Sequence, residues 1–280
     1  MGVSRVVLQY VVSGALVGLV VGATGVGGGS LMTPLLTLVF GVPAQVAVGT
    51  DLLFASITKS GGAWTFARRG QVRWPIVVWL ALGSVPASCL TLATVRQWHP
   101  DAVQFNELLR PVLGLALLLT AAALAFRTQI QLLGARAITN AQPTLVGSGN
   151  SAYFAAASVD RSLRPAPTVA LGALIGVLVT LTSVGAGAIG VVALFFLYPS
   201  LAARELVAAD IAHAVPLTLI AGLGHAALGT VDWAMLLALL LGSLPAIHVG
   251  ARLATRLPER VLRTFLATML VLIGLRLLWA

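Results

Sequence analysis

The chain has 280 residues, of which 59% are hydrophobic and only 9% are charged, and its mean hydropathy is +1.00. Because soluble domains carry about 25% charged residues, this composition excludes an ordinary soluble fold and predicts a protein embedded in a membrane. One span takes about 20 apolar residues, so the length allows about eight to ten membrane segments with short loops.

Ten hydrophobic runs follow one another along the chain. They cover residues 6–24, 30–40, 46–67, 75–95, 108–126, 166–183, 188–198, 206–228, 233–251 and 261–279. The first run has no clear small-residue cleavage site, so it is expected to be a retained helix rather than a signal peptide. The runs 30–40 and 188–198 are too short to cross about 30 Å of hydrocarbon. Since each follows a glycine-rich turn, the sequence predicts an all-α integral membrane protein with interrupted, half or re-entrant helices.

The formal net charge is +9, and the arginines that dominate it are unevenly distributed. When the sides of the membrane are alternated along the runs, twelve arginines fall on one side and four on the other. The twelve are Arg68, Arg69, Arg73, Arg127, Arg136, Arg161, Arg164, Arg204, Arg252, Arg256, Arg260 and Arg263, and the four are Arg5, Arg96, Arg110 and Arg276. This bias predicts that the first side is cytoplasmic and that both termini lie on the outer side of the membrane. The basic residues form short pieces rather than one surface, so no nucleic-acid partner is expected.

An internal repeat divides the chain. A shift of 159 residues aligns residues 70–87 with residues 229–246 and gives nine identities in eighteen positions. The predicted parts are an N-terminal repeat, 1–126, a cytoplasmic linker, 127–165, and a C-terminal repeat, 166–280. Each half holds five runs, an odd number, so the second half enters the membrane from the opposite side. Such inverted-topology repeats are typical of secondary transporters, whose substrate sites lie near the midplane.

Two glycine-rich turns are the predicted binding segments. A shift of 158 places residues 24–29 on residues 182–187. Clustered glycines disfavour a continuous helix, and the freed N–H groups at the start of the next half-helix suit an anion. We therefore expect two opposed half-helix starts to face one small oxyanion. The candidate binding residues are Thr24, Gly25, Gly27, Gly28, Gly29, Ser30, Thr182, Ser183, Gly185 and Gly187.

Other glycines recur at intervals of four, and close helix packing is the favoured interpretation for them. They are Gly14, Gly18, Gly22, Gly172 and Gly176.

Ionisable residues inside apolar runs are the candidates for coupling or gating, because such groups are costly within a membrane. They are Asp51, Lys59, Asp210 and His213. Asp51 and Asp210 are counterparts in the repeat, and His213 shares a helix face with Asp210. Two interpretations of the carboxylates stay open: both lie by the substrate site, or both are hydrated near the end of a run. Lys59, the only lysine, either neutralises the anion or pairs with a carboxylate. His225 and His248 are expected to be interfacial.

Several other classes of function are excluded. The single cysteine, Cys89, cannot form an internal disulfide and is expected to be a buried thiol. A dinucleotide-binding motif would need glycine where Ser30 stands, and a phosphate loop would need glycine where Thr58 stands. The best serine for hydrolysis, Ser148, lies in the linker with no histidine placed beside it by spacing. We expect no enzyme activity, no cofactor and no metal site.

The motifs together resemble the TauE/SafE family of sulfite exporters. The similar residues are the run Gly27-Gly28-Gly29-Ser30-Leu31-Met32-Thr33-Pro34, the segment Val48-Gly49-Thr50-Asp51 and the duplicated Gly-Ser-x-Pro-Ala segments. The resemblance implies an inner-membrane permease for sulfite, organosulfonates or related anions, with residues 24–30 at the anion. The second half departs from the pattern at Ala186, Ala188 and Val192, so its turn is expected to rely more on Thr182 and Ser183.

The sequence therefore predicts a secondary transporter that exports sulfite or an organosulfonate such as sulfoacetate by alternating access, with possible proton or cation coupling. The alternative is a passive anion channel in which the same turns form a constriction. The expected partners are the anion and the lipid bilayer, and the sequence leaves the oligomeric state open.

Overall fold

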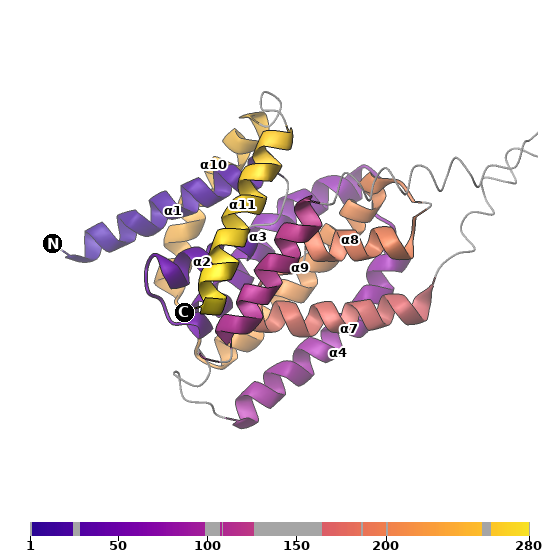
Figure 1. Cartoon of the computed structure of the whole chain (residues 1–280), viewed down its shortest axis with the longest axis horizontal. Coiled ribbons are helices and arrows are strands. Elements are labelled where there is room, and N and C mark those ends of the chain that lie inside the picture. The colour runs from indigo at the N-terminus through magenta and orange to yellow at the C-terminus, as the bar shows by residue number, and fades with distance from the viewer. Residues whose placement is uncertain are drawn as a thin grey trace, which may run out of the picture.

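The computed structural model describes residues 2–24, 29–98, 107, 109–125, 164–185, 187–199, 201–253 and 259–279. Within these ranges the chain is all helical and has no strand. The helices are α1 (Gly2–Thr24), α2 (Gly29–Leu38), α3 (Ala44–Arg68), α4 (Trp74–Trp98), the unlabelled helix Leu109–Ala125, α7 (Pro165–Thr182), α8 (Ala188–Leu197), α9 (Ala203–Ala227), α10 (Trp233–Leu253) and α11 (Glu259–Trp279) (Figure 1). Each of the ten hydrophobic runs therefore corresponds to one helix of the described residues. The predicted linker, 127–165, lies outside the described residues as far as residue 163.

Five helices are long and apolar enough to cross a membrane by themselves, namely α1, α4, α7, α9 and α10. Leucines such as Leu82 on α4 and Leu241 on α10 are exposed on the outside of the bundle. The indole rings of Trp74 and Trp233 are exposed at the first residues of α4 and α10, where a membrane interface favours them. These features identify a multi-pass membrane protein.

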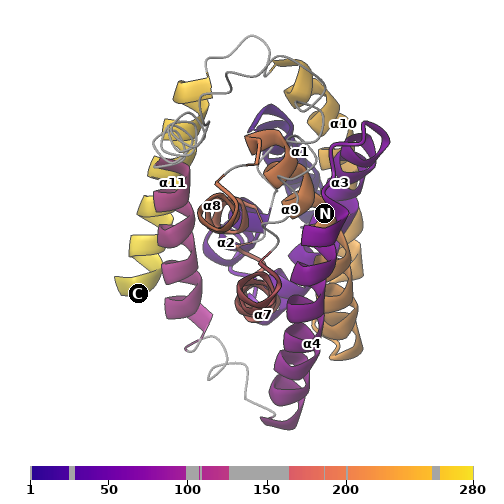
Figure 2. The ribbon, with the colours of Figure 1, turned by 90° about the vertical axis from the view of Figure 1, so that its right-hand side faces the viewer.

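Both predicted half-helices are present as separate short helices; the second break is described, whereas residues 25–28 of the first lie outside the described residues. α1 ends at Thr24 and the ten-residue α2 begins at Gly29, while α7 ends at Thr182 and the ten-residue α8 begins at Ala188. Figure 2 shows these two short helices near the middle of the bundle, between α11 on one side and α4 and α10 on the other.

The second break is formed by backbone that a helix cannot contain. Ser183 is left-handed with φ of 57°, and Gly185 and Gly187 have φ of 118° and 142°. Residues other than glycine rarely adopt the φ values of Gly185 and Gly187. The Thr182 hydroxyl holds the turn by donating to the carbonyl of Leu178 at 2.6 Å and accepting from the N–H of Val184 at 3.1 Å.

Helices of the first half pack against helices of the second half. α1 packs along α10, α7 packs along α4, and α3 packs along α9, so each of these pairs joins one half to the other (Figure 1). Glycines allow the first two contacts, since a Cβ atom at any of them would collide with backbone of the facing helix. Gly14, Gly18 and Gly22 face Leu239, Ser243 and Ile247, and Gly172 and Gly176 face Leu80 and Ser84. The packing interpretation of these five glycines is confirmed.

The expectation of a buried Cys89 is wrong, because this thiol is exposed on α4. α4 turns one face toward its neighbours, including Gly83, Ser84 and Ser88, and Cys89 points away from that face. An apolar run in a membrane helix continues around the whole circumference, so the run alone does not distinguish the buried face from the lipid-facing one.

Candidate functional site

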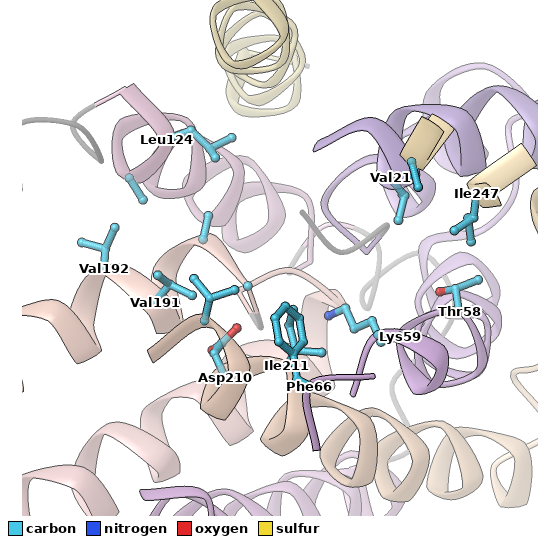
Figure 3. A pocket seen from close by; sticks show the side chains of 17 residues that line it. Val21, Thr58, Lys59, Phe66, Leu124, Val191, Val192, Asp210, Ile211 and Ile247 are labelled. Atoms are coloured by element: carbon cyan, nitrogen blue, oxygen red, sulfur yellow. The ribbon is translucent and has the colours of Figure 1, made fainter. Parts of the chain in front are cut away.

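A cavity of about 290 Å³ lies between helices of both halves. Its walls come from the end of α1, from α3, from the helix Leu109–Ala125, from the start of α8, from α9 and from α10. Lys59 and Asp210 are its only charged lining residues among those described, and their side chains point into it from α3 and α9 (Figure 3). Apart from Thr58, the other lining side chains are apolar or absent, so one basic and one acidic residue share an otherwise apolar pocket.

Lys59 lies in the second half of α3 and is 8% exposed. Its ammonium group lies within electrostatic range of two carboxylates, those of Asp210 and Asp51. A buried lysine inside a membrane protein is stable only where charged or polar partners compensate for lost hydration. Lys59 therefore faces a cavity and has carboxylates near it, so its position is compatible with either role that the sequence left open.

Asp210 is 1% exposed, and neither of its carboxylate oxygens accepts a hydrogen bond from the described residues. The start of α8 closes over it, because a Cβ atom at Gly190 would collide with Asp210 Oδ1. His213 lies one turn further along α9, with Nε2 at 2.7 Å from the Ser84 hydroxyl of α4. His213 Nδ1 is buried without a hydrogen-bond partner in the described part of the chain.

Asp51 is completely buried, and its environment differs from that of Asp210. Asp51 Oδ2 accepts hydrogen bonds from the Thr33 hydroxyl at 2.5 Å and from the Thr33 N–H at 3.2 Å. The buried hydroxyl of Ser183 lies near the same carboxylate without making a well-formed hydrogen bond. Because both carboxylates are buried, the interpretation that they are hydrated at the ends of runs is wrong.

The predicted anion-binding residues are only partly visible. Gly25, Gly27 and Gly28 lie outside the described residues, as do the side chains of Thr24 and Ser30, while Gly29 begins α2. In the second turn, Gly187 and the first residue of α8 line the cavity. The structure therefore brings one half-helix start to the same space as Lys59.

The remaining residues of that turn lie elsewhere. The Thr182 hydroxyl is engaged by neighbouring backbone, and Ser183 faces Asp51. Gly185 Cα is covered by the side chain of Leu178. None of these three residues lines the cavity.

Sequence reasoning missed Thr33 and Ser84 as partners of ionisable groups. It also misplaced His225, which is buried rather than interfacial. His225 Nε2 lies 3.0 Å from the carbonyl of Thr180, and Nδ1 lies 2.9 Å from the Thr230 hydroxyl. His225 therefore ties the end of α9 to α7, a tertiary contact that its position near the end of a run does not reveal. The repeat did contain a signal for Thr33. The corresponding position in the second half is a valine, so a hydroxyl is present in only one of the two halves.

Comparison with known proteins agrees with this architecture. The family model described as "Sulfite exporter TauE/SafE" matches residues 10–277. "Probable membrane transporter protein YjnA" of Bacillus subtilis (strain 168) is 32% identical over 283 residues, covering 97% of this chain and 99% of the relative. "Probable membrane transporter protein YdhB" of the same organism is 28% identical over 264 residues, covering 94% of this chain and 97% of the relative. No solved structure matches the chain.

Proposed function

The chain belongs to the TauE/SafE family, and from this premise we propose that it is a secondary transporter that exports a small sulfur-containing anion. The proposed substrate is sulfite or an organosulfonate such as sulfoacetate, carried across the bacterial inner membrane by alternating access. The observation that carries this proposal is that the only lysine of the chain and the start of half-helix α8 face one cavity.

The cavity suits an oxyanion for two physical reasons. The first N–H groups of a helix carry partial positive charge and point outward, and Gly187 and Ala188 bring such a terminus to the cavity wall. Lys59 adds a full positive charge in a space with little water, where attraction to an anion is strong. The glycine turn before α2, residues 24–30, completes the proposed site from the other half.

Alternating access needs two units that move relative to each other, and the halves 1–126 and 166–280 are the proposed units. In support, the helix pairs exchange symmetrically: the first helix of each half packs on the fourth helix of the other. With five helices per half, the proposed topology is inverted, both termini lie outside, and the linker 127–165 is cytoplasmic. The proposed coupling and gating groups around the α3–α9 contact are drawn from Asp51, Lys59, Asp210 and His213.

Transport by the purified protein in liposomes tests the proposal. We expect uptake of labelled sulfite or sulfoacetate to saturate and to respond to an imposed proton or sodium gradient, with taurine, sulfate and thiosulfate as competitors. Flux that does not saturate and follows voltage alone would instead identify a passive anion channel. If none of these anions crosses the membrane or competes, the proposed substrate class is wrong.

A further inference from the structure

We propose that the two carboxylates duplicated with the halves have divided their roles, so that Asp51 fixes α2 against α3 while Asp210 takes up the proton that accompanies the anion. This inference rests on the proposed function, since it assigns the coupling to one residue of the same site. In this proposal the two carboxylates are not equivalent proton-coupling groups: Asp51 has a structural role, and Asp210 binds and releases the proton.

The hydrogen bonds of Asp51 explain its structural role. Two donors on α2, the hydroxyl and the N–H of Thr33, converge on Oδ2 of Asp51 in α3. Hydrogen bonds to a charged acceptor are stronger than those between neutral groups, and they favour the charged form of the Asp51 carboxylate. Its other oxygen, Oδ1, is buried without a hydrogen-bond partner among the described residues. Asp51 does not line the cavity. A substrate in the cavity therefore has no direct contact through which to exchange with this carboxylate.

Asp210 has the opposite properties. It lines the cavity, it is buried, and neither oxygen accepts a hydrogen bond from the described residues. Among the described residues, Lys59 on the facing helix is the cation that favours its charged form. A buried carboxylate with a single cationic partner and no hydrogen-bond donors changes its protonation state when that partner is engaged elsewhere.

The sequence explains the difference between the two carboxylates. Thr33 falls on Val191 under the shift that aligns the turns, and on Val192 under the shift that aligns Asp51 with Asp210. Under either alignment α8 offers Asp210 a valine where α2 offers Asp51 a hydroxyl, and both valines line the cavity. Lys59 has diverged as well, because its counterpart under the shift of 159 is Thr218.

The exchange is balanced in charge and protons. Without substrate, the Asp210 carboxylate neutralises Lys59. When a monovalent anion occupies the cavity it becomes the counter-ion of Lys59, and the carboxylate beside it takes a proton from water, because two anions cannot share one ammonium group at low cost. Release of the anion returns Asp210 to Lys59 and frees the proton.

Other ionisable groups around Asp210 do not replace it in this exchange. From α3, Lys59 acts on Asp210 and also on Asp51, while His213 follows one turn along α9. Asp51 is held by Thr33, and His213 is bonded to Ser84 outside the cavity lining. The α8 residues against Asp210, Gly190 and Val191, do not titrate.

Titration calorimetry on the full-length protein in nanodiscs tests this division with ethanesulfonate as the probe. Sulfonic acids are strong acids, so the charge of the probe is constant, and buffers of different ionisation enthalpy count the protons taken up. For the wild type we expect about one proton per anion bound, with affinity falling up to about tenfold per pH unit on the alkaline side. Asp210→Asn should bind without proton uptake and without this pH dependence.

Asp51→Asn is the matched control, since it changes the counterpart residue in the other half. It should keep the proton uptake and lower the melting temperature. Val191→Thr provides a second variant if Asp210→Asn does not fold. A threonine hydroxyl beside Asp210 reproduces the arrangement at Asp51 and favours the charged carboxylate, so uptake at neutral pH should decrease.

The outcomes separate this inference from the function on which it rests. Retained proton uptake in Asp210→Asn, its loss in Asp51→Asn, or wild-type binding with no proton uptake would overturn the division of roles and leave the anion transporter intact. Wild-type protein that binds neither ethanesulfonate nor sulfite at any pH would contradict the proposed function itself, and this inference with it.

Discussion

The hydroxyl of Ser56 donates a hydrogen bond of 3.4 Å to the carbonyl oxygen of Val215, a residue 159 positions later in the chain. This separation equals the shift that aligns the two halves, so Ser56 contacts its own counterpart at the crossing of α3 and α9. A two-fold axis relating the halves would pass through such a contact, which supports the proposed symmetry. One turn further along α3 the symmetry ends, because Lys59 faces the cavity while its counterpart Thr218 donates to the carbonyl of Ala214 on its own helix.

Replacing Lys59 with methionine should lower anion uptake into liposomes about tenfold or more, because the variant removes the positive charge of the cavity and leaves Asp210 without its counter-ion. Lys59→Arg, which keeps the charge, should retain more transport than Lys59→Met. Thr218→Val, at the counterpart position, should transport like the wild type. Equal rates for Lys59→Met and the wild type would show that the anion does not depend on this charge.

Thr33→Val should reduce the free energy of unfolding by about 1 to 2 kcal/mol, since it removes the hydroxyl that donates to buried Asp51. Thr37→Val is the control on the same helix. Its hydroxyl donates only to carbonyls of α2, those of Thr33 and Pro34, so its loss should cost less than about 0.5 kcal/mol. Denaturant unfolding in detergent measures both, and similar losses would contradict a structural role for the Asp51–Thr33 contact.

Gly18→Val should destabilise the contact between α1 and α10. A Cβ atom at Gly18 would lie 2.6 Å from the carbonyl oxygen of Ser243, and backbone cannot move aside as a flexible side chain can. We expect a loss of about 2 to 3 kcal/mol. Gly61→Ala is the control, because a Cβ atom added at this position of α3 would have no neighbour within 4 Å. Thermal unfolding should show Gly61→Ala unchanged or slightly stabilised, and a stable Gly18→Val would mean that the helices are not in close contact.

His225→Phe should lower stability by about 1 to 3 kcal/mol, because it leaves the half-buried hydroxyl of Thr230 and the carbonyl of Thr180 without the imidazole. His248→Phe on the exposed face of α10 should change stability by less than about 0.5 kcal/mol. Melting temperatures of the two purified variants compare them directly. Equal values would indicate that the imidazole of His225 does not join α9 to α7.

Much of the fold was predictable because its signals are local. Runs of apolar residues predicted the ten helices of the described residues, and the glycine clusters predicted that α2 and α8 are separate short helices, since backbone preference acts over a few residues. The spacing of Gly14, Gly18 and Gly22 predicted close packing, although not that α10 is the partner. In the same way, the cost of charge in an apolar run identified Lys59 and Asp210 before their common cavity was known.

The rest depended on which side chains meet across the fold. Nothing in the order of residues places Thr33 against Asp51, Ser84 against His213 or His225 against Thr180, because each contact joins different helices. The unequal environments of Asp51 and Asp210 were likewise hidden, since the repeat suggested equal roles. A comparison of Thr33 with Val191 would have suggested the inequality, because only the threonine can donate a side-chain hydrogen bond.

The exchange of helices between the halves also bears on how the molecule is assembled. Among the described helices, α1 makes its most extensive contact with α10, which the ribosome adds near the end of synthesis. The first half therefore enters the bilayer before the packing partners of its glycine-rich helix surfaces have been synthesised. These surfaces become packed only when the second half has been inserted. Each half should consequently be degraded when it is expressed alone, and both halves should accumulate when they are expressed in the same cell.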